Sequence, residues 1–535
     1  MSDFFYRTED IGPKDILKFL VETEADREAI DQLKGRNPTV LIGSRGVGKS
    51  FLMRVAEQEL LSNHQESGVI PVFVTFVSSS LLRTADPDQF RHWMLARICT
   101  SILRTVRKLG LLASTPASAN ILAGLPADHS DTAKLEKLIK SYEESWKSPG
   151  QTVDAGAIPS VDDVKYALED LAEEIGASRF ALFMDEAAHI FLPSQQRQFF
   201  TLFRDLRSHC ITCNAAVYPG VTSYGDTFQP THDATMISVN RDISADGYIE
   251  SMRQIVEKQA DSKLLKNISK NRQNFATLAY AATGNPRILL KTVFSALDMS
   301  SSDINSVIRS FYRTDIWSEH SALSDKYSGH APVIDWGRNF LEDVVLPDLK
   351  KKNDTYLGNE RNSTAFIWIH REAPESVKEA LRILCYTGVL TEHASGMRGT
   401  RSEIGTRYLC NLGCLFSLES NPATSSFAIA QALTPKRMSE FGANHSSYKS
   451  LIDKEGDLGD IQEGFDLEEQ LSKSNTVLDI TPWQRSKLDA LGLHTVGQVL
   501  DASEDKLKEA FYVGDKRARQ MRNAALASVL EYLSG

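Results

Sequence analysis

The residues most able to do chemistry form a glycine-rich stretch, Gly43-Ser44-Arg45-Gly46-Val47-Gly48-Lys49-Ser50, which fits G-x-x-x-x-G-K-[ST] at every position. Backbone N–H groups of such a loop cradle a triphosphate, the lysine reaches the β- and γ-phosphates, and the serine hydroxyl binds Mg²⁺. We therefore expect residues 43–50, together with Phe51, to bind ATP, with Lys49 at the terminal phosphates and Ser50 as a metal ligand. A glycine-rich surface turn is the alternative.

A second group of polar residues follows an apolar run, Phe180 to Met184, and consists of the carboxylates Asp185 and Glu186. If the run is a buried parallel strand, both carboxylates lie at its carboxyl edge, where ligands of open α/β sheets bind. We expect Asp185 to hold Mg²⁺ through its water shell and Glu186 to orient or deprotonate the attacking water. The pair indicates hydrolysis, and an acidic N-cap of a following helix is the alternative.

The elements that would position these residues alternate between strand and helix over residues 1 to about 310. The expected strands are residues 39–42, 71–76, 180–184, 211–217 and 234–239, and helical patterns fill most of the intervals, including 15–33. This alternation is typical of an α/β fold with a parallel five-stranded sheet covered on both faces. Residues 108–160 interrupt it with Ala-, Ser-, Pro- and Gly-rich sequence around a charged helix at 132–146, which indicates an insertion.

These features resemble the core of the AAA+ ATPases, and in particular the origin-recognition-type ATPases and the related STAND signalling NTPases. The likeness covers residues 1 to about 310 and rests on residues 43–50, 185–186, 216–220 and the motif Gly284-Asn285-Pro286-Arg287. It implies a nucleotide-binding core at 1–245 and a helical lid at 246–318.

The same resemblance assigns roles to arginines. Arg287 would reach the γ-phosphate from the lid, since a guanidinium matches phosphate oxygens. Arg207, with Arg204 as second choice, would act in trans on a neighbouring subunit's nucleotide, which implies a homo-oligomer. A solvated helix arginine is the alternative in each case. The fourth strand often ends in a polar Asn or Thr sensor in these families, but Tyr218 stands here, and the sensor stays unassigned.

The second half of the chain changes character. Residues 319–417 combine an apolar helical pattern with a glycine-punctuated stretch containing Arg398, Arg401 and Arg407. This predicts a winged-helix-like domain of the kind that follows the lid in origin-recognition-type ATPases, whose basic wing would meet DNA phosphates. Residues 418–474 are polar and increasingly acidic, which predicts a linker extended by its own charge.

The last segment, 475–535, resembles a helix-hairpin-helix module, most closely the C-terminal domain of the bacterial RNA polymerase alpha subunit. Gly514 would let backbone N–H groups approach a phosphate, and the cations beside it are Lys516, Arg517, Arg519 and Arg522. Only one glycine of the usual hairpin pair is present. DNA is the expected ligand, and a protein partner is the alternative.

Composition limits the remaining possibilities. The 535 residues carry a formal net charge of −10, so any contact with nucleic acid must use local basic patches. No run approaches a membrane span, and the chain starts without a basic region and an apolar stretch, so we expect a cytoplasmic protein with no membrane partner. The spacing of Cys210 with Cys213 and of Cys410 with Cys414 allows a zinc site, but core packing is the favoured interpretation.

We therefore predict an AAA+ ATPase with ATP and Mg²⁺ as cofactors, which couples hydrolysis to oligomer assembly and DNA binding. By resemblance, replication, mobile-element control or anti-phage defence would be its setting. The alternative is a STAND-type signalling switch whose C-terminal modules bind a protein effector.

Overall fold

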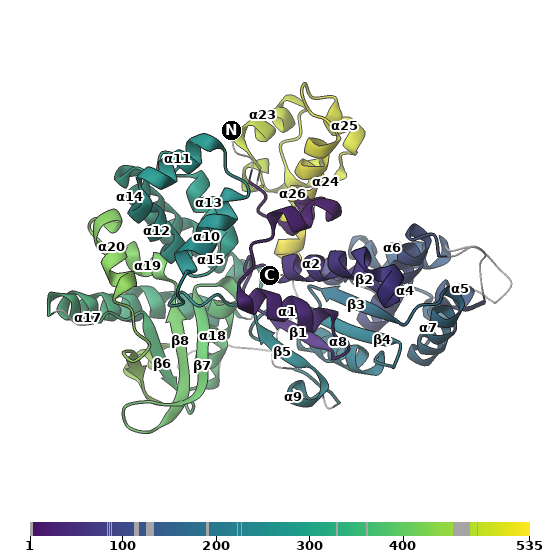
Figure 1. The fold of residues 1–535 in the computed structure, drawn as a ribbon, viewed down its shortest axis with the longest axis horizontal. Coiled ribbons are helices and arrows are strands. Elements are labelled where there is room, and N and C mark those ends of the chain that lie inside the picture. The colour runs from purple at the N-terminus through teal and green to yellow at the C-terminus, as the bar shows by residue number, and fades with distance from the viewer. Residues whose placement is uncertain are drawn as a thin grey trace.

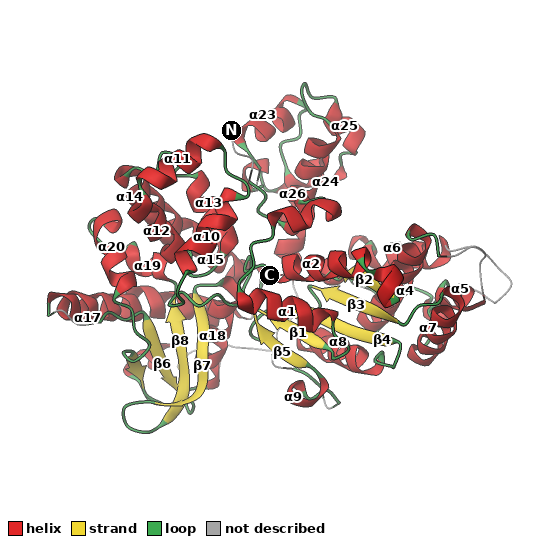
Figure 2. Cartoon of the chain, viewed as in Figure 1, coloured by secondary structure: helices red, strands yellow, loops and turns green. Residues whose placement is uncertain are grey.

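The computed structural model describes residues 4–534 apart from residues 83, 85, 87, 112–116, 125–132, 189–191, 222, 226, 328–329, 360–361, 453–470 and 479. A five-stranded sheet with flanking helices, a helical lid, a second sheet and a small helical C-terminal module follow one another along the chain (Figures 1 and 2). Within the described ranges no helix is long and apolar enough to cross a bilayer.

The first sheet has five parallel strands in the order β2-β3-β4-β1-β5. They span Thr39–Ile42 (β1), Val69–Thr75 (β2), Arg179–Asp185 (β3), Ile211–Val217 (β4) and Thr235–Ser238 (β5). The predicted α/β fold with a five-stranded parallel sheet is confirmed. Because the strands run in one direction, their carboxyl ends meet at one edge, and this brings the segments after β1, β3 and β4 together.

Successive residues of each strand point to opposite faces, and helices cover both. Val40 and Leu182 pack with one layer of helices, whereas Leu41 and Phe183 pack with the other. The first layer contains α4 (Gln89–Lys108), α7 (Val161–Ile175) and α8 (Pro193–Asp205), and the second contains α1 (Glu24–Lys34) and α2 (Lys49–Ser62). Burial on both faces explains why the strands read as continuous apolar runs. The short helices α3 (His64–Ser67) and α9 (Pro230–Asp233) precede β2 and β5.

The N-terminal segment differs from the single helix predicted at 15–33. It forms the 3₁₀ turns η1 (Thr8–Asp10) and η2 (Pro13–Phe19) and then breaks before α1. The break falls at a capping box, in which Thr23 accepts a hydrogen bond from the Asp26 N–H and the Asp26 carboxylate accepts one from the Thr23 N–H. These local bonds start a new helix at Glu24.

The predicted insertion at 108–160 is packed against α4 where the structure describes it. It contains α5 (Ala117–Leu122) and α6 (Ala133–Glu143). Leu135 and Tyr142 are buried, and the Glu143 carboxylate accepts hydrogen bonds from Trp93 Nε1 at 3.1 Å and Arg97 Nη1 at 2.8 Å. The insertion therefore extends the core on the side of α4.

The lid consists of helices α10 (Tyr248–Glu257), α11 (Ser262–Lys270), α12 (Arg272–Ala281), α13 (Pro286–Phe294) and α14 (Ser301–Ser310). The helix then continues through a π-helical segment, Phe311–Asp315, into α15 (Ile316–Lys326). The domain boundary predicted at 318 thus lies inside a continuous helix, because no glycine or proline interrupts residues 311–326.

The second sheet has the order β7-β8-β6-β9, with strands Leu390–Arg398, Ile404–Cys410, Phe366–His370 and Ser439–Phe441 respectively. Helices lie around it. α16 (Ala331–Asn339) continues through a second π-helical segment, Phe340–Val345, into α17 (Leu346–Gly358), and α18 (Glu375–Thr387) follows β6. β7 and β8 form an antiparallel hairpin directly after α18. The helix and hairpin expected within 319–417 are present, and the winged-helix assignment itself stays a prediction.

The linker predicted at 418–474 is wrong for its first 35 residues, 418–452, which are folded. α19 (Leu412–Phe416) leads into α20 (Pro422–Gln431), which packs on α12 and α14 of the lid, and β9 extends the second sheet. Tyr448 and Leu451, the latter in α21 (Lys449–Ile452), are buried. The segment carries enough apolar residues to join the core, and the concentrated acidic residues from 453 to 470 lie outside the described part of the chain.

The C-terminal module contains η11 (Asn475–Val477), α23 (Pro482–Ala490), α24 (Val496–Asp501), α25 (Glu504–Lys508) and α26 (Asp515–Ser534). Its core includes Leu488, Val499 and Met521, and Leu81 of η3 (Val77–Leu81) joins the same cluster. Since η3 follows β2, the module lies beside the carboxyl edge of the first sheet (Figure 1). The helix-hairpin-helix assignment stays a prediction.

Candidate nucleotide-binding and hydrolysis site

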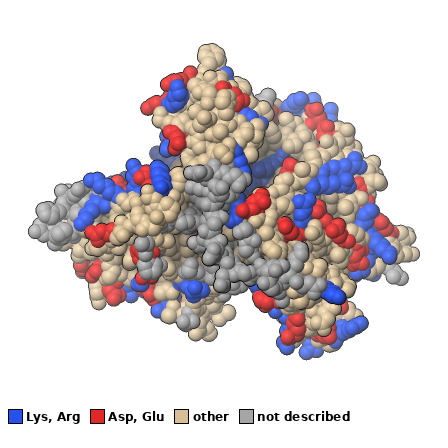
Figure 3. All heavy atoms as spheres, turned by 180° about the vertical axis from the view of Figure 1, so that it is seen from behind, with Lys and Arg blue, Asp and Glu red and all other residues tan. Residues whose placement is uncertain are grey.

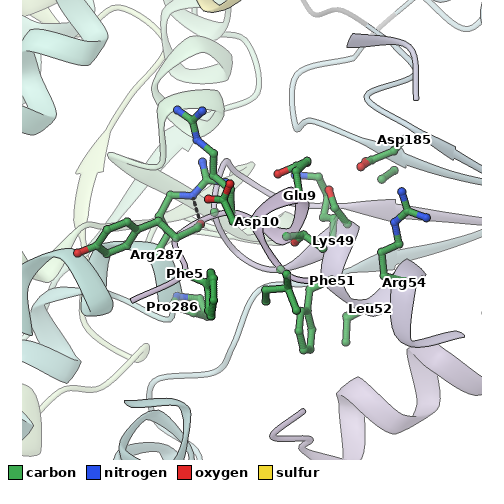
Figure 4. Close-up of a pocket in the computed structure, with 18 of the residues that line it drawn as sticks. Phe5, Glu9, Asp10, Lys49, Phe51, Leu52, Arg54, Asp185, Pro286 and Arg287 are labelled. Atoms are coloured by element: carbon green, nitrogen blue, oxygen red, sulfur yellow. Dashed lines mark hydrogen bonds between the residues drawn. The ribbon is translucent and has the colours of Figure 1, made fainter. Parts of the chain in front are cut away.

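A pocket of about 400 Å³ opens at the carboxyl edge of the first sheet. Its lining includes the loop and helix start after β1, the N-terminal turn η1, the ends of β2, β3 and β4, and the first turn of α13 in the lid. Figure 4 shows Lys49 and Glu9 facing its interior, with Asp185 on one side and Arg287 on the other.

The glycine-rich loop joins β1 to α2 and takes a conformation that depends on glycine. Gly46 and Gly48 have φ angles of +82° and +108°, which residues other than glycine rarely adopt. The Lys49 Nζ donates hydrogen bonds to the carbonyls of Gly43 at 2.7 Å and Ser44 at 3.0 Å. The pocket is lined by Arg45, Gly46, Gly48, Lys49, Ser50 and Phe51, whereas Gly43, Ser44 and Val47 are not among its lining residues.

The ionisable groups of the site are buried and influence one another. Burial lowers the pKa of Lys49, while the carboxylates of Asp185 and Glu186 act in the opposite direction. Burial, reinforced by the charge of Glu186, raises the pKa of Asp185, and a hydrogen bond from the Ser50 hydroxyl partly offsets this rise. Shifts of this kind are concentrated where charge is assembled for chemistry.

Glu186 follows β3 in a left-handed conformation with a φ angle of +52°. A non-glycine residue in this region is strained and is held there by its surroundings. Its Oε1 accepts a hydrogen bond from the Tyr218 hydroxyl at 3.3 Å, and burial raises the pKa of the carboxyl. The residue is therefore fixed at the end of the strand by both backbone and side chain.

The residues predicted to hold Mg²⁺ fit that ion. Ser50 and the buried Asp185 both line the pocket, and the Ser50 hydroxyl lies close enough to Asp185 to lower the pKa of its carboxyl, so both residues offer oxygen ligands at the same part of the site. Mg²⁺ takes oxygen ligands and binds through one or two protein groups plus phosphates. When bound, the ion would neutralise developing charge on the phosphate oxygens.

The lid motif at 284–287 contacts the glycine-rich loop directly. The Asn285 Nδ2 donates to the Arg45 carbonyl at 2.7 Å, and the Asn285 Oδ1 caps α13 by accepting from the Ile288 N–H. A Cβ added at Gly46 would lie 2.8 Å from the Arg287 Cβ. The Arg287 Nε donates to the Tyr6 carbonyl at 3.0 Å, shown dashed in Figure 4, which places this predicted residue at the pocket.

The structure brings together the predicted residues of the loop, the acidic pair and the lid, but Arg207 lies elsewhere. Arg207 follows α8, is exposed, and its Nη1 donates to the Asp233 carbonyl at 3.4 Å. It does not line the described pocket. Arg204 is held by Asp205 at 2.7 Å and by the Thr227 carbonyl at 3.0 Å. Neither arginine lines the nucleotide pocket of its own chain, and the role in trans stays a prediction beside the alternative of a solvated helix arginine.

Two pocket residues were missed by the sequence reasoning. Arg241, after β5, donates to the Val47 carbonyl at 3.0 Å and pairs with Asp26 at 3.3 Å, so it ties the loop to α1. Glu9 of η1 faces Lys49 and adds negative charge that helps raise the pKa of both Asp185 and Glu186. Neither residue belongs to a sequence motif. Their roles become visible only in the fold, which brings the segments around residues 9 and 241 to the pocket.

The cysteine pairs are accounted for by packing. All six cysteines are buried, and burial raises the pKa of the Cys213 thiol to about 12. Among the described residues, the group whose ligand atoms cluster is Glu169, His209 and Cys210, which includes Cys210 without Cys213 and contains neither Cys410 nor Cys414.

The fold and this site define a P-loop ATPase of the AAA+ class. Residues 4–273, half of the chain, match the family model described as ORC-CDC6-like, and the chain belongs to this family. The predicted resemblance to the origin-recognition-type ATPases is thereby confirmed. No curated protein matches the chain.

The solved structures that are similar over most of the chain include the following three. The Walker-type ATPase PABY2304 of Pyrococcus abyssi is 14% identical, with a TM-score of 0.38, and the match covers 80% of this chain and 97% of that one. The Aeropyrum pernix ORC1 protein in complex with DNA is 12% identical, with a TM-score of 0.30 and coverages of 79% and 94%. The Aeropyrum pernix ORC2 protein in ADPNP and ADP complexes is 11% identical, with a TM-score of 0.35 and coverages of 77% and 94%.

Proposed function

We propose that this ATPase binds ATP and Mg²⁺ in the pocket described above and that hydrolysis there controls assembly with further copies of the chain and binding to DNA. The observation that carries the proposal is the pocket that holds Lys49 and Ser50 together with Asp185 and Glu186. It joins the loop after β1 to the acidic pair after β3 in one buried site.

The proposed roles follow from the charges and positions of the side chains. Lys49 and Arg287 stabilise the γ-phosphate, and Ser50 and Asp185 hold the metal. Glu186 accepts a proton from water while the water oxygen bonds to the γ-phosphorus. The bond from that phosphorus to the β–γ bridging oxygen breaks, and ADP leaves with the electron pair.

A pair of variants tests these roles. Lys49→Ala is expected to weaken ATP binding, because it removes the buried cation, whereas Glu186→Gln should leave binding intact and abolish turnover. Lys263→Ala removes an exposed lid cation that pairs with Asp298 and serves as the matched control. Binding is measured with a fluorescent ATP analogue and turnover by phosphate release. Equal loss of binding in both site variants would contradict the assigned roles.

Assembly is proposed from the position of Arg207, which is exposed and does not line the pocket of its own chain. If it completes a neighbour's site, the variants Arg207→Ala and Glu186→Gln should each be inactive alone, and mixing them should restore part of the activity. Arg204→Ala tests the second-choice arginine, whose guanidinium is held by Asp205 and the Thr227 carbonyl. Arg371→Ala, an exposed arginine paired with Glu372, is the control. ATPase rate should also rise more steeply than protein concentration. A linear rise and no recovery on mixing would refute a shared site.

DNA binding is proposed through local arginines. On the face drawn in Figure 3, acidic and basic side chains are interspersed, so no broad positive field is available there. Arg398 and Arg401, at the β7–β8 turn, are exposed. Arg407 is not free for phosphate, because it donates to the Pro435 carbonyl at 2.7 Å and lies over the Phe366 ring.

The C-terminal module offers a second set of cations. Arg517 donates to the Tyr512 carbonyl at 2.8 Å and lies 4.8 Å from the centre of the Trp483 ring, and Arg519 faces Glu504 at 3.4 Å. Arg522 is exposed, and the Lys516 side chain lies outside what the structure describes. Because Arg517 and Arg519 already have partners within the module, the β7–β8 turn is the stronger candidate for phosphate contact.

The test is binding of duplex DNA by the full chain at several salt concentrations. The double variant Arg398→Ala, Arg401→Ala should bind more weakly and with a salt slope reduced by about 2, one unit for each lost phosphate contact. Arg371→Ala, an exposed arginine paired with Glu372, is the control. Duplex DNA should also stimulate the ATPase. The absence of salt-dependent binding would favour a protein effector as the ligand of these modules.

A further inference from the structure

Tyr218, the first residue after β4, makes contacts on both sides of the proposed reaction centre. Its hydroxyl donates to the Glu186 Oε1 at 3.3 Å, and the Lys49 Nζ lies 4.3 Å from the centre of its ring. Burial raises the pKa of Tyr218 well above its usual value, so the hydroxyl keeps its proton and acts as a donor. One side chain therefore touches the proposed base and the phosphate-binding lysine.

The Tyr218 ring also meets the second half of the chain. Tyr386 of α18 packs edge-on against it, with ring centres 5.0 Å apart and planes at 80°. Such edge-to-face pairs fix the relative position of two rings. Tyr386 lies in the helix that leads into the β7–β8 hairpin, so the ring pair joins Glu186 to the part of the chain with the exposed arginines.

Two further approaches show that α18 packs closely on the nucleotide site. A Cβ built at Gly220, whose φ angle is +96°, would lie 3.4 Å from the Arg382 Cβ of α18. A Cβ built at Gly388, which ends α18 with a φ angle of +79°, would lie 3.4 Å from the Ser44 Oγ. The helix and its C-cap thus lie against the glycine-rich loop, Tyr218 and Gly220, so a displacement of α18 would change the packing of the nucleotide site.

We propose that Tyr218 is a positioning residue that holds the Glu186 carboxylate for attack by water, and that α18 sets the position of Tyr218 through Tyr386. This inference rests on the proposed role of Glu186. Turnover, but not ATP binding, then depends on how α18 is seated against the nucleotide core. DNA bound by the β7–β8 hairpin can act on hydrolysis by this route.

The first test is Tyr218→Phe, which keeps the ring and its contacts with Lys49 and Tyr386 and removes only the hydroxyl. Loss of a hydrogen bond to a charged group should lower kcat roughly tenfold or more. KM for ATP and the dissociation constant of a non-hydrolysable ATP analogue should stay at wild-type values. Unchanged kcat, or a loss confined to KM, would overturn the positioning role.

The second test combines the change with Glu186→Gln. If the hydroxyl acts through Glu186, adding Tyr218→Phe to Glu186→Gln should not lower the residual turnover further. An equal additional loss in that background would show that Tyr218 acts by another route and would overturn the inference. If Glu186→Gln alone retains full turnover, the proposed function of the glutamate fails instead, so the two failures are distinguishable.

The third test addresses α18. Tyr386→Ala removes the edge contact and should reproduce the loss of kcat with unchanged KM, and Tyr386→Phe, which keeps the ring, should restore it. Thermal unfolding of each variant separates this effect from loss of folded protein. If Tyr386→Ala leaves kcat at the wild-type value while Tyr218→Phe lowers it, the coupling to α18 is refuted.

Discussion

The buried His320 makes the packing of α15 against α16 and α18 sensitive to acid. Its side chain is fully buried, its Nε2 donates to the Ile334 carbonyl at 3.1 Å, and its Nδ1 lies 3.2 Å from the Thr387 hydroxyl. Burial lowers the pKa of His320 from 6.5 to about 4, and the nearby Arg338 charge acts in the same direction. The folded chain therefore keeps this imidazole neutral at pH values where the unfolded chain protonates it.

The sign and size of the effect follow by linkage. Above the unfolded-state pKa of 6.5, a histidine with a lowered folded-state pKa does not change the free energy of unfolding. As the pH falls below 6.5, the unfolded chain binds the proton first, so the free energy of unfolding decreases until the pH reaches the folded-state pKa. A difference of about 2.5 pKa units corresponds to roughly 3.4 kcal/mol when the change is complete. Between about pH 7.5 and about pH 5, the free energy of unfolding should fall by about 2 kcal/mol from this residue alone.

The assay is urea-induced unfolding, followed through the transition that includes α15 to α18, at several pH values. His320→Gln removes the titration, so the difference between wild type and variant should shrink by about 2 kcal/mol over this interval. Other titrating groups are common to both proteins and cancel. Parallel pH profiles of the two proteins would refute the reasoning, because they would show that His320 titrates alike in the folded and unfolded chains.

Two further changes have effects that the geometry fixes. Gly413→Ala would place a Cβ 2.2 Å from the Tyr312 ring and should destabilise the protein by about 1–3 kcal/mol or more in thermal unfolding. Gly442→Ala is the control, because a Cβ there has no atom within 4 Å, and it should be nearly neutral. Asn285→Ala should cost about 1 kcal/mol as a lost helix cap and should also weaken ATP binding, because its bond to the Arg45 carbonyl holds the lid on the loop. Asn285→Asp keeps the capping oxygen but lacks the amide donor, so it should restore the free energy of unfolding but not the affinity for ATP. Recovery of both would contradict separate roles for the oxygen and the amide group of Asn285.

Much of the fold could be predicted from the sequence because its signals are local. The strand ranges follow from short apolar runs, and the loop after β1 follows from glycines whose backbone angles few other residues allow. The acidic pair was found because it ends such a run. The interpretation of 418–452 as a linker failed since its scattered apolar residues form no periodic stretch, and they are buried only by contact with the lid and second sheet.

The amino-acid sequence by itself determined that a phosphate-binding loop and a pair of carboxylates stand at the ends of buried strands, because spacing and backbone conformation are local properties. Only the tertiary structure decided which side chains meet there. The hydrogen bond from Tyr218 to Glu186 joins residues 32 positions apart, and the one from Arg241 to the Val47 carbonyl joins residues 194 positions apart. Glu9 approaches Lys49 from the N-terminal turn η1. No pattern in the sequence encodes such pairs, since chain topology and the packing of α18 and the lid bring them together.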